Sequence, residues 1–171
     1  METVKKFLSK KNVLKILRWF LIASMILTIT FIFGQSLKSQ EKSAETSEKV
    51  EQIIEPILPS DTPVGGYVQD NIRKIAHFVE FFFLGAECAA FVAVFLRKRT
   101  YVLYSYLFSV VVALLDETIQ IFSDRGSSVA DVWLDIFGFA VASSIVYVVW
   151  VIYFRLKKVR TSESNEVSGD V

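Results

Sequence analysis

The sequence predicts an all-α fold, a polytopic membrane helix bundle with four transmembrane helices. Of its 171 residues, 53% are hydrophobic and the mean hydropathy is +0.44, which is too apolar for an ordinary soluble domain. The apolar residues come in long runs, and a helix that spans a bilayer needs about 20 of them. Four runs satisfy this requirement, at roughly 17–34, 75–96, 101–122 and 132–154.

The first run follows a basic segment, as in a signal peptide, but we expect an uncleaved anchor helix. The basic residues of this segment are Lys5, Lys6, Lys10, Lys11, Lys15 and Arg18. The apolar run behind them is near full spanning length, and Gly34-Gln35-Ser36-Leu37 is not a small-x-small cleavage site. The chain is therefore predicted to enter the membrane with this segment and to keep it.

The loop between the first and second runs is predicted to contain a short amphipathic helix that lies on the outer membrane surface. Its apolar residues recur at helical spacing, as Val50, Ile53, Ile54, Ile57 and Leu58. Pro56 falls inside this pattern, so we expect the helix to kink or stop there. A turn-rich segment from Pro59 to Gly66 leads to the second run.

The three later runs each carry polar side chains at one end. At about 100° per residue, each set falls on or near one helix face. The candidate site residues are Arg73, His77, Glu80 and Glu87 on the second run, Asp116, Glu117 and Gln120 on the third, and Asp131 and Asp135 on the fourth. If the runs alternate in direction, these ends share one side of the membrane. Ionisable groups cost about 2.5–3.5 kcal/mol each inside a bilayer and are functional-site candidates by default. Lipid cannot satisfy them, so we expect the polar faces to meet inside the bundle.

The basic residues predict the orientation. They gather before the first run, in the 97–100 loop and after the fourth run, whereas the 123–131 loop has only Arg125. By the positive-inside rule, the chain is a multi-pass protein of the cell membrane with both termini cytoplasmic and the polar ends outside. Residues 1–160 are expected to form a single transmembrane domain, and 161–171 a disordered cytoplasmic tail. The basic residues lie beside the spans, so we expect no nucleic-acid partner.

Several of these residues have a structural role as their simplest interpretation. Ser128-Val129-Ala130-Asp131 matches a capping box, so Asp131 is expected to cap the fourth helix. Glu87 lies about 10 Å deeper than Glu80, and we expect its carboxyl group to be neutral and to hydrogen-bond between helices. Cys88 is the single cysteine, which excludes an intramolecular disulfide and predicts a buried apolar side chain.

The outer polar residues suit three kinds of task. His77 with the neighbouring carboxylates could hold a divalent cation that bridges to a phosphate. The same groups could perform general acid/base chemistry. They could also bind a polar headgroup by hydrogen bonds without chemistry. In each case, Arg73 and Arg125 would attract an anionic headgroup.

Two blocks of these residues resemble the motifs of the VanZ-like family. The blocks are Arg73-Lys74-x-x-His77-Phe78-x-Glu80-Phe81-Phe82-x-Leu84-Gly85 and Asp116-Glu117-x-x-Gln120-x-Phe122-x-x-Arg125-Gly126-x-Ser128-x-x-Asp131-x-x-x-Asp135-x-x-Gly138. The resemblance covers about residues 15–150 and implies a small integral membrane protein. Its founding relative is linked to teicoplanin resistance in Gram-positive bacteria. Asp135 departs from the pattern, since relatives often have Asn there.

The resemblance and the polar cluster together lead to three functional hypotheses. The first is a protein whose outer-leaflet site binds a lipid-linked cell-envelope precursor or a glycopeptide antibiotic, and which contributes to antibiotic resistance or envelope homeostasis. An intramembrane, metal-assisted hydrolase of a polyprenyl-phosphate-type headgroup is the alternative. A small transporter, oligomeric and supported by Glu87 near the midplane, is the third. The sequence shows no nucleophilic Ser or Cys beside a base, which favours binding over catalysis. A divalent cation is the one cofactor that these residues suggest.

Overall fold

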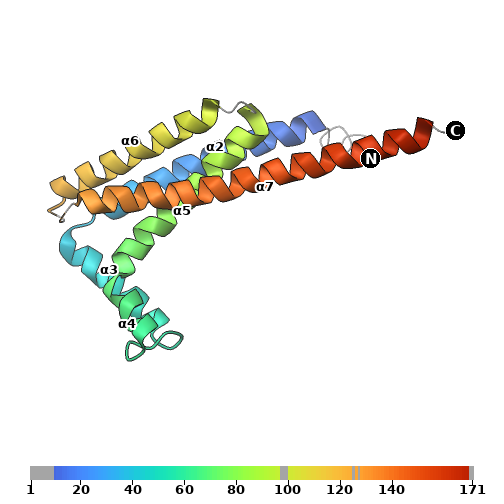
Figure 1. Ribbon diagram of the computed structural model, residues 1–171. Helices are drawn as coiled ribbons and strands as arrows, with labels where there is room; N and C mark the ends of the chain where they lie inside the picture. Colours follow the sequence, from blue (N-terminus) through green and yellow to red (C-terminus); the bar gives the residue numbers. More distant parts are fainter. Residues whose placement is uncertain (1–9, 97–99, 125, 127, 170–171) are drawn as a thin grey trace, which may run out of the picture.

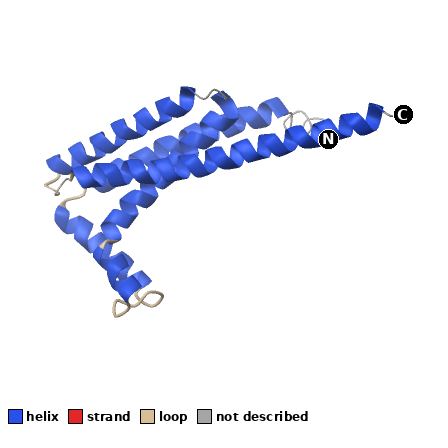
Figure 2. Ribbon diagram, viewed as in Figure 1, coloured by secondary structure: helices blue, strands red, loops and turns tan. Residues whose placement is uncertain are grey.

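In this computed structural model, residues 10–96, 100–124, 126 and 128–169 are described. Within that part of the chain every regular element is a helix, as Figure 2 shows. Four helical segments are long and apolar enough to cross a membrane, which confirms the predicted spans. They lie in α2 (Lys10–Ser36), in α5 (Ile72–Phe91) with its π-helical continuation η1 (Val92–Leu96), in α6 (Thr100–Phe122) and in α7 (Val129–Gly169).

The long helices run roughly side by side, and the polar ends of three of them meet at one end of the bundle. Figure 1 shows the start of α2 and the end of α7 at one end of the bundle, and the end of α6 and the start of α7 at the other. At that second end α6 stops at Phe122, and Asp124 follows with a φ of 52°. This left-handed conformation is one that Asp tolerates, and it turns the chain toward α7. The α2–α3 connection lies at the same end (Figure 1).

The closest helix contact in the bundle joins α5 and α7, whose interface is the most extensive of the fold. A Cβ atom on Gly85 would lie 2.4 Å from the backbone oxygen of Phe139, and one on Gly138 would lie 2.5 Å from the oxygen of Phe78. Ser143 Oγ also donates to the Gly85 carbonyl at 3.1 Å. Small residues thus let the two backbones touch, as is common between membrane helices. This contact fixes the register between the polar ends of α5 and α7.

The buried core lies between the helices and leaves most large apolar side chains exposed on the outside. Ile32, Leu84 and Phe139 are fully buried, whereas aromatic residues such as Phe83 are exposed. Phe81 on α5 is also fully buried. The reason is spacing: Phe81 comes one turn after His77, so it occupies the same inward face.

Two short helices form an arm between α2 and α5, projecting from the bundle in Figure 1. The predicted amphipathic helix is α3 (Gln40–Ile54), and it stops before Pro56 as expected. The second helix, α4 (Pro63–Asp70), was not predicted. Its first residues nevertheless follow the usual pattern of a helix start. Thr62 Oγ1 accepts a 3.0 Å hydrogen bond from Gly65 N, and Pro63 occupies the first helical position.

The C-terminal segment differs from the prediction of a disordered tail. Helix α7 continues to Gly169, so residues 161–169 are helical. The physical reason lies in the sequence after the span, where Gly169 is the first glycine or proline to follow Phe154. Polar composition alone therefore did not stop a helix that had already begun in the membrane.

Candidate functional site

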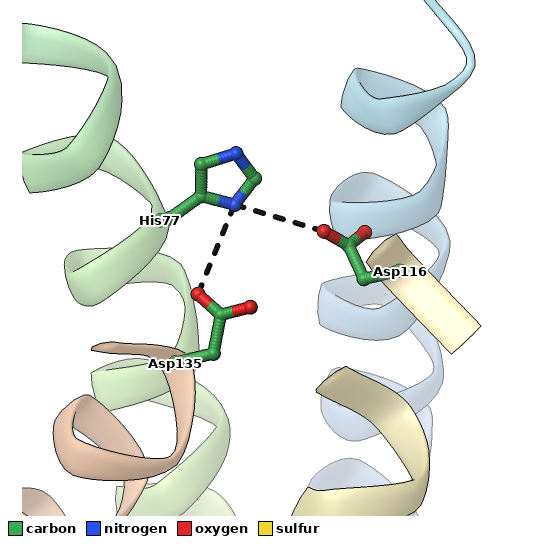
Figure 3. Close-up of side chains that lie close together, drawn as sticks. All are labelled: His77, Asp116 and Asp135. Atoms are coloured by element: carbon green, nitrogen blue, oxygen red, sulfur yellow. Dashed lines mark ion pairs between the residues drawn. The ribbon is translucent and has the colours of Figure 1, made fainter. Parts of the chain in front are cut away.

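Three buried side chains from three helices converge near the end of the bundle where α6 connects to α7. They are His77 on α5, Asp116 on α6 and Asp135 on α7, and Figure 3 shows them pointing toward one another. His77 Nδ1 lies 3.7 Å from Asp116 Oδ2 and 3.9 Å from Asp135 Oδ1. Each residue contributes one potential ligand atom, and the three atoms lie within 4.8 Å of one another. We call these three residues the His77 cluster.

Asp116 is held in place by hydrogen bonds from two helices. Ser36 Oγ at the end of α2 donates to Asp116 Oδ1 at 2.6 Å. Gln120 Nε2, one turn along α6, donates to Asp116 Oδ2 at 2.8 Å. The oxygen of the same amide accepts from Arg73 Nη2 at 2.6 Å, which carries the network to the start of α5. These bonds orient the carboxylate so that Oδ2 faces His77.

Glu117 joins this network to the beginning of α7. Its Oε1 accepts from Gln120 Nε2 at 3.2 Å, and its Oε2 accepts from the backbone N of Ser128 at 2.9 Å. Ser128 Oγ in turn accepts from Ala130 N at 3.1 Å, so the predicted N-cap serine is present. In a capping box Asp131 would receive the Ser128 N–H, but Glu117 takes it. Asp131 is an acidic residue in the first turn of α7, where its negative charge interacts favourably with the positive end of the helix dipole.

Asp135 differs from Asp116 in its hydrogen bonding. Its side chain is fully buried, and neither carboxylate oxygen has a hydrogen-bond partner among the described residues. Its Oδ1 lies 3.9 Å from His77 Nδ1, a distance longer than a hydrogen bond. A buried carboxylate without partners is costly, so such a group marks a place where a ligand or ion would stabilise the fold.

A cavity of ≈ 100 Å³ opens beside the cluster, between α3 and α5. Its wall on α5 includes Arg73, His77 and Glu80, three of the predicted site residues. The remaining lining residues are Gln35, Ser43, Thr46, Ser47, Val50, Ile72 and Ala76. His77 therefore belongs both to the cavity wall and to the buried cluster, so the cavity gives access to the cluster through that ring.

Glu87 takes part in a separate contact deeper in the bundle. Its Oε1 accepts hydrogen bonds from Ser24 Oγ at 2.5 Å and from Thr28 Oγ1 at 3.2 Å, both on α2. The hydrogen bond between helices that was predicted for Glu87 is thus present. Seven residues separate Glu87 from Glu80, which is about 10 Å along the helix axis. The contact ties α2 to α5 and does not reach the cavity.

The structure brings most of the predicted site residues together. Those in one hydrogen-bonded or ion-paired network are Arg73, His77, Asp116, Glu117, Gln120 and Asp135. Glu80 lines the cavity, and Asp131 lies at the start of α7. Arg125 is outside the described residues. Sequence reasoning missed Ser36 as a site residue, although Ser24, Thr28, Ile32 and Ser36 recur every four residues on one face of α2.

A comparison with protein families identifies a match over most of the chain. The family described as VanZ/LLP1 matches residues 19–162, which include all three residues of the His77 cluster. The family resemblance inferred from the two sequence blocks is thereby confirmed. No curated protein and no solved structure gives a match to this chain.

Proposed function

The chain belongs to the VanZ/LLP1 family, and we propose that this member binds the phosphate end of a lipid-linked cell-envelope precursor in the cavity between α3 and α5. The bundle of four apolar helices fits a multi-pass membrane protein, in which such a lipid reaches the cavity from the bilayer. The lipid chain would lie along the apolar outside of the helices, and its polar end would enter the cavity. In this proposal the protein binds the lipid and catalyses no reaction.

The observation that carries the proposal is the composition of the cavity. Arg73 offers a guanidinium group, which is well suited to phosphate oxygens, and Glu80 and His77 offer further polar atoms. Val50 on α3 and Ile72 on α5 also line the cavity and are apolar, as expected where a lipid chain begins. One cavity thus combines the two chemistries of an amphiphilic phosphate.

The size of the cavity limits which ligands can enter it. At ≈ 100 Å³ it is smaller than the about 300–1,000 Å³ of pockets that enclose drug-sized molecules. The peptide core of a glycopeptide antibiotic is too large for it, whereas a phosphate group is of suitable size. An effect on glycopeptide susceptibility would therefore come indirectly, through the lipid-linked precursor.

The arm and the charge pattern support a location at the outer surface of the cell membrane. Ile53, Ile57, Val64 and Tyr67 on the arm are exposed to a large extent, between 63% and 78%. Exposed apolar side chains of this kind suit the boundary between headgroups and acyl chains. The basic residues favour cytoplasmic termini, and the start of α2 and the end of α7 lie at the bundle end opposite the cluster (Figure 1).

The proposal is tested by lipid binding to the purified full-length chain in nanodiscs, measured by native mass spectrometry. The ligands are a polyprenyl phosphate and the polyprenol of the same length, which differ only in the phosphate. Arg73→Gln removes the cationic group of the cavity. Lys74→Gln is the matched control, because Lys74 is exposed on the next position of α5 and does not line the cavity.

We expect the wild type and Lys74→Gln to bind the phosphate ester in preference to the alcohol. Arg73→Gln should lose about tenfold in affinity for the phosphate ester, the equivalent of one charge-assisted contact. Equal binding of phosphate and alcohol, or equal affinity of both variants, would contradict the proposal. Release of inorganic phosphate during incubation would instead favour the hydrolase hypothesis.

A further inference from the structure

We propose that the His77 cluster binds one divalent transition-metal cation, with His77 Nδ1, Asp116 Oδ2 and Asp135 Oδ1 as its ligands. The cation would lie at the meeting point of α5, α6 and α7, beside the cavity between α3 and α5. This metal site goes beyond the proposed lipid binding and does not depend on it.

The distances within the cluster suit metal ligands better than hydrogen-bond partners. The separations of 3.7 Å and 3.9 Å from His77 Nδ1 exceed the usual range of a hydrogen bond. Ligand atoms at about 2.0–2.2 Å from a tetrahedral ion are about 3.4 Å apart. Small rotations of the three side chains would bring the atoms, now within 4.8 Å of one another, to that separation.

The bonding of Asp135 supplies an independent reason for an ion. This side chain is 0% exposed and aimed at the cluster, and both of its oxygens lack hydrogen-bond partners among the described residues. An isolated carboxylate at such a position costs several kcal/mol of effective desolvation free energy, unless a cation or proton compensates it. A metal ion bound to Oδ1 would provide that compensation.

The surrounding network also contains more carboxyl groups than cationic groups. Asp116, Glu117 and Asp135 bring three buried carboxyl groups to this region. Arg73 is the cationic residue among the described contacts of the network. Its guanidinium group donates hydrogen bonds to Gln120 Oε1 and to the Gly126 carbonyl, and neither of these hydrogen bonds goes to a carboxylate. One divalent cation would restore the balance. It would also make the region attractive, rather than repulsive, to a phosphate group in the adjacent cavity.

The donor set indicates the class of metal. One imidazole nitrogen and two carboxylate oxygens suit Zn²⁺ or Mn²⁺ better than thiolate-preferring ions. Asp116 already has the supporting contacts that fix a metal ligand, from Ser36 and Gln120. Three protein ligands leave a coordination position for water or for an anionic oxygen, as in metal sites that bind a further ligand.

The test measures metal content of the full-length chain without any lipid phosphate. Detergent-purified protein is stripped with a chelator, loaded with Zn²⁺ or Mn²⁺, desalted and analysed by elemental mass spectrometry. Asp135→Asn and Asp116→Asn remove one anionic ligand each with little change in size. Asp131→Asn is the matched control, an acid-to-amide change one turn earlier on the same helix. Thermal unfolding with chelator and with Zn²⁺ provides a second readout for each variant.

The expected result is one bound cation per chain in the wild type and in Asp131→Asn, together with a metal-dependent rise in Tm. Asp135→Asn and Asp116→Asn should retain less than about a tenth of that content and show no metal-dependent rise. A wild type that binds no cation, or a content that is equal in all variants, would overturn the metal site. The assay contains no lipid phosphate, so its failure is distinguishable from a failure of headgroup binding.

Discussion

Ser36 Oγ at the last turn of α2 donates a 2.6 Å hydrogen bond to Asp116 Oδ1 on α6, between residues 80 positions apart in the sequence. Both side chains are fully buried. The bond links the first transmembrane helix to the acidic centre of the bundle, and it sets the orientation of the carboxylate that faces His77. A small hydroxyl group therefore contributes both to the stability of the helix bundle and to the geometry of the site.

Replacing Ser36 with alanine should lower the stability of the bundle. The change leaves Asp116 Oδ1 without its buried donor, and we expect a loss of about 1–2 kcal/mol in the free energy of unfolding. Ser105→Ala is the control, since Ser105 Oγ donates its hydrogen bond to the carbonyl of Val102 within its own helix. Denaturant unfolding in mixed micelles measures both. A loss for Ser105→Ala as large as for Ser36→Ala would show that the inter-helix bond is not the cause.

The contact between α5 and α7 should tolerate no additional methyl group. In Gly85→Ala the new Cβ would lie 2.4 Å from a backbone oxygen of Phe139, so the helices must separate. Overpacking of this kind costs about 1–3 kcal/mol. Gly34→Ala is the matched control, because a Cβ atom at this position meets nothing within 4 Å. Alanine is also a better helix former than glycine by about 1 kcal/mol. Thermal unfolding should order the proteins as Gly34→Ala at or above wild type and Gly85→Ala below. The reverse order would contradict the packing described for α5 and α7.

The turn of the arm should depend on pH through Glu55, which lies outside the spans. Hydrogen bonds from Gln69 and then from the backbone and side chain of Ser60 lower the pKa of Glu55 below its usual 4.5. Because the pKa is lower in the folded state, the ionised carboxylate stabilises the turn fully at pH values above the usual pKa of 4.5. This stabilisation is lost as the pH falls through the lowered pKa. Because Glu55 is only partly buried and its hydrogen-bond partners lie within the arm, the change should be confined to the arm.

Spin labels at Glu45→Cys on α3 and Tyr67→Cys on α4, in a Cys88→Ala background, report this change as a distance distribution. The distribution should be narrow at neutral pH and should broaden in acid. Glu55→Gln should already be broader at neutral pH and respond less to acid, whereas Glu48→Gln should behave as the parent. If Glu55→Gln kept the full pH response, another group would be responsible.

The fold was largely predictable because bilayer length and helical periodicity leave few choices. The four apolar runs determine the spans, and the polar stripe on each predicts which faces meet. The second helix of the arm was harder to predict, because α4 has two glycines, Gly65 and Gly66, within eight residues. Gly65 is nevertheless required, since its Cβ would lie 2.0 Å from the Pro59 oxygen. A tertiary contact of this kind has no local sequence signal.

Most residues of the candidate site were predictable from the sequence, but the contacts between them were not. Helical spacing places His77, Asp116 and Asp135 on inward faces, yet spacing alone gives no relative depth across three helices. The capping-box pattern assigned the Ser128 amide to Asp131, whereas it binds Glu117 from another helix. Hydrogen bonds between helices depend on rotation and register, which the α5–α7 contact decides. The distinction between a hydrogen-bonded Asp116 and an Asp135 without such bonds therefore appears only in the structure.

In cells, the lipid-binding proposal predicts a change in susceptibility to antibiotics that act on envelope precursors. A strain that lacks this chain should differ from wild type in its growth in the presence of glycopeptides such as teicoplanin. The reason is that the lipid-linked precursor would no longer be bound by this protein, which changes how much of it is accessible to the antibiotic. Complementation at matched protein levels with Lys74→Gln should restore growth, and complementation with His77→Ala or Glu80→Gln should not. Restoration by all three variants would separate the growth effect from the cavity.

The central claim, that a phosphate-bearing lipid occupies the cavity between α3 and α5, is tested most directly by photocrosslinking. A polyprenyl phosphate with a photoreactive group next to the phosphate is bound to the chain in nanodiscs, irradiated and mapped by peptide mass spectrometry. The account predicts labels on the peptides that contain Val50 and Ile72, and competition by unlabelled polyprenyl phosphate but not by polyprenol. Labels spread along exposed apolar positions such as Leu107 and Val148, without competition, would contradict it.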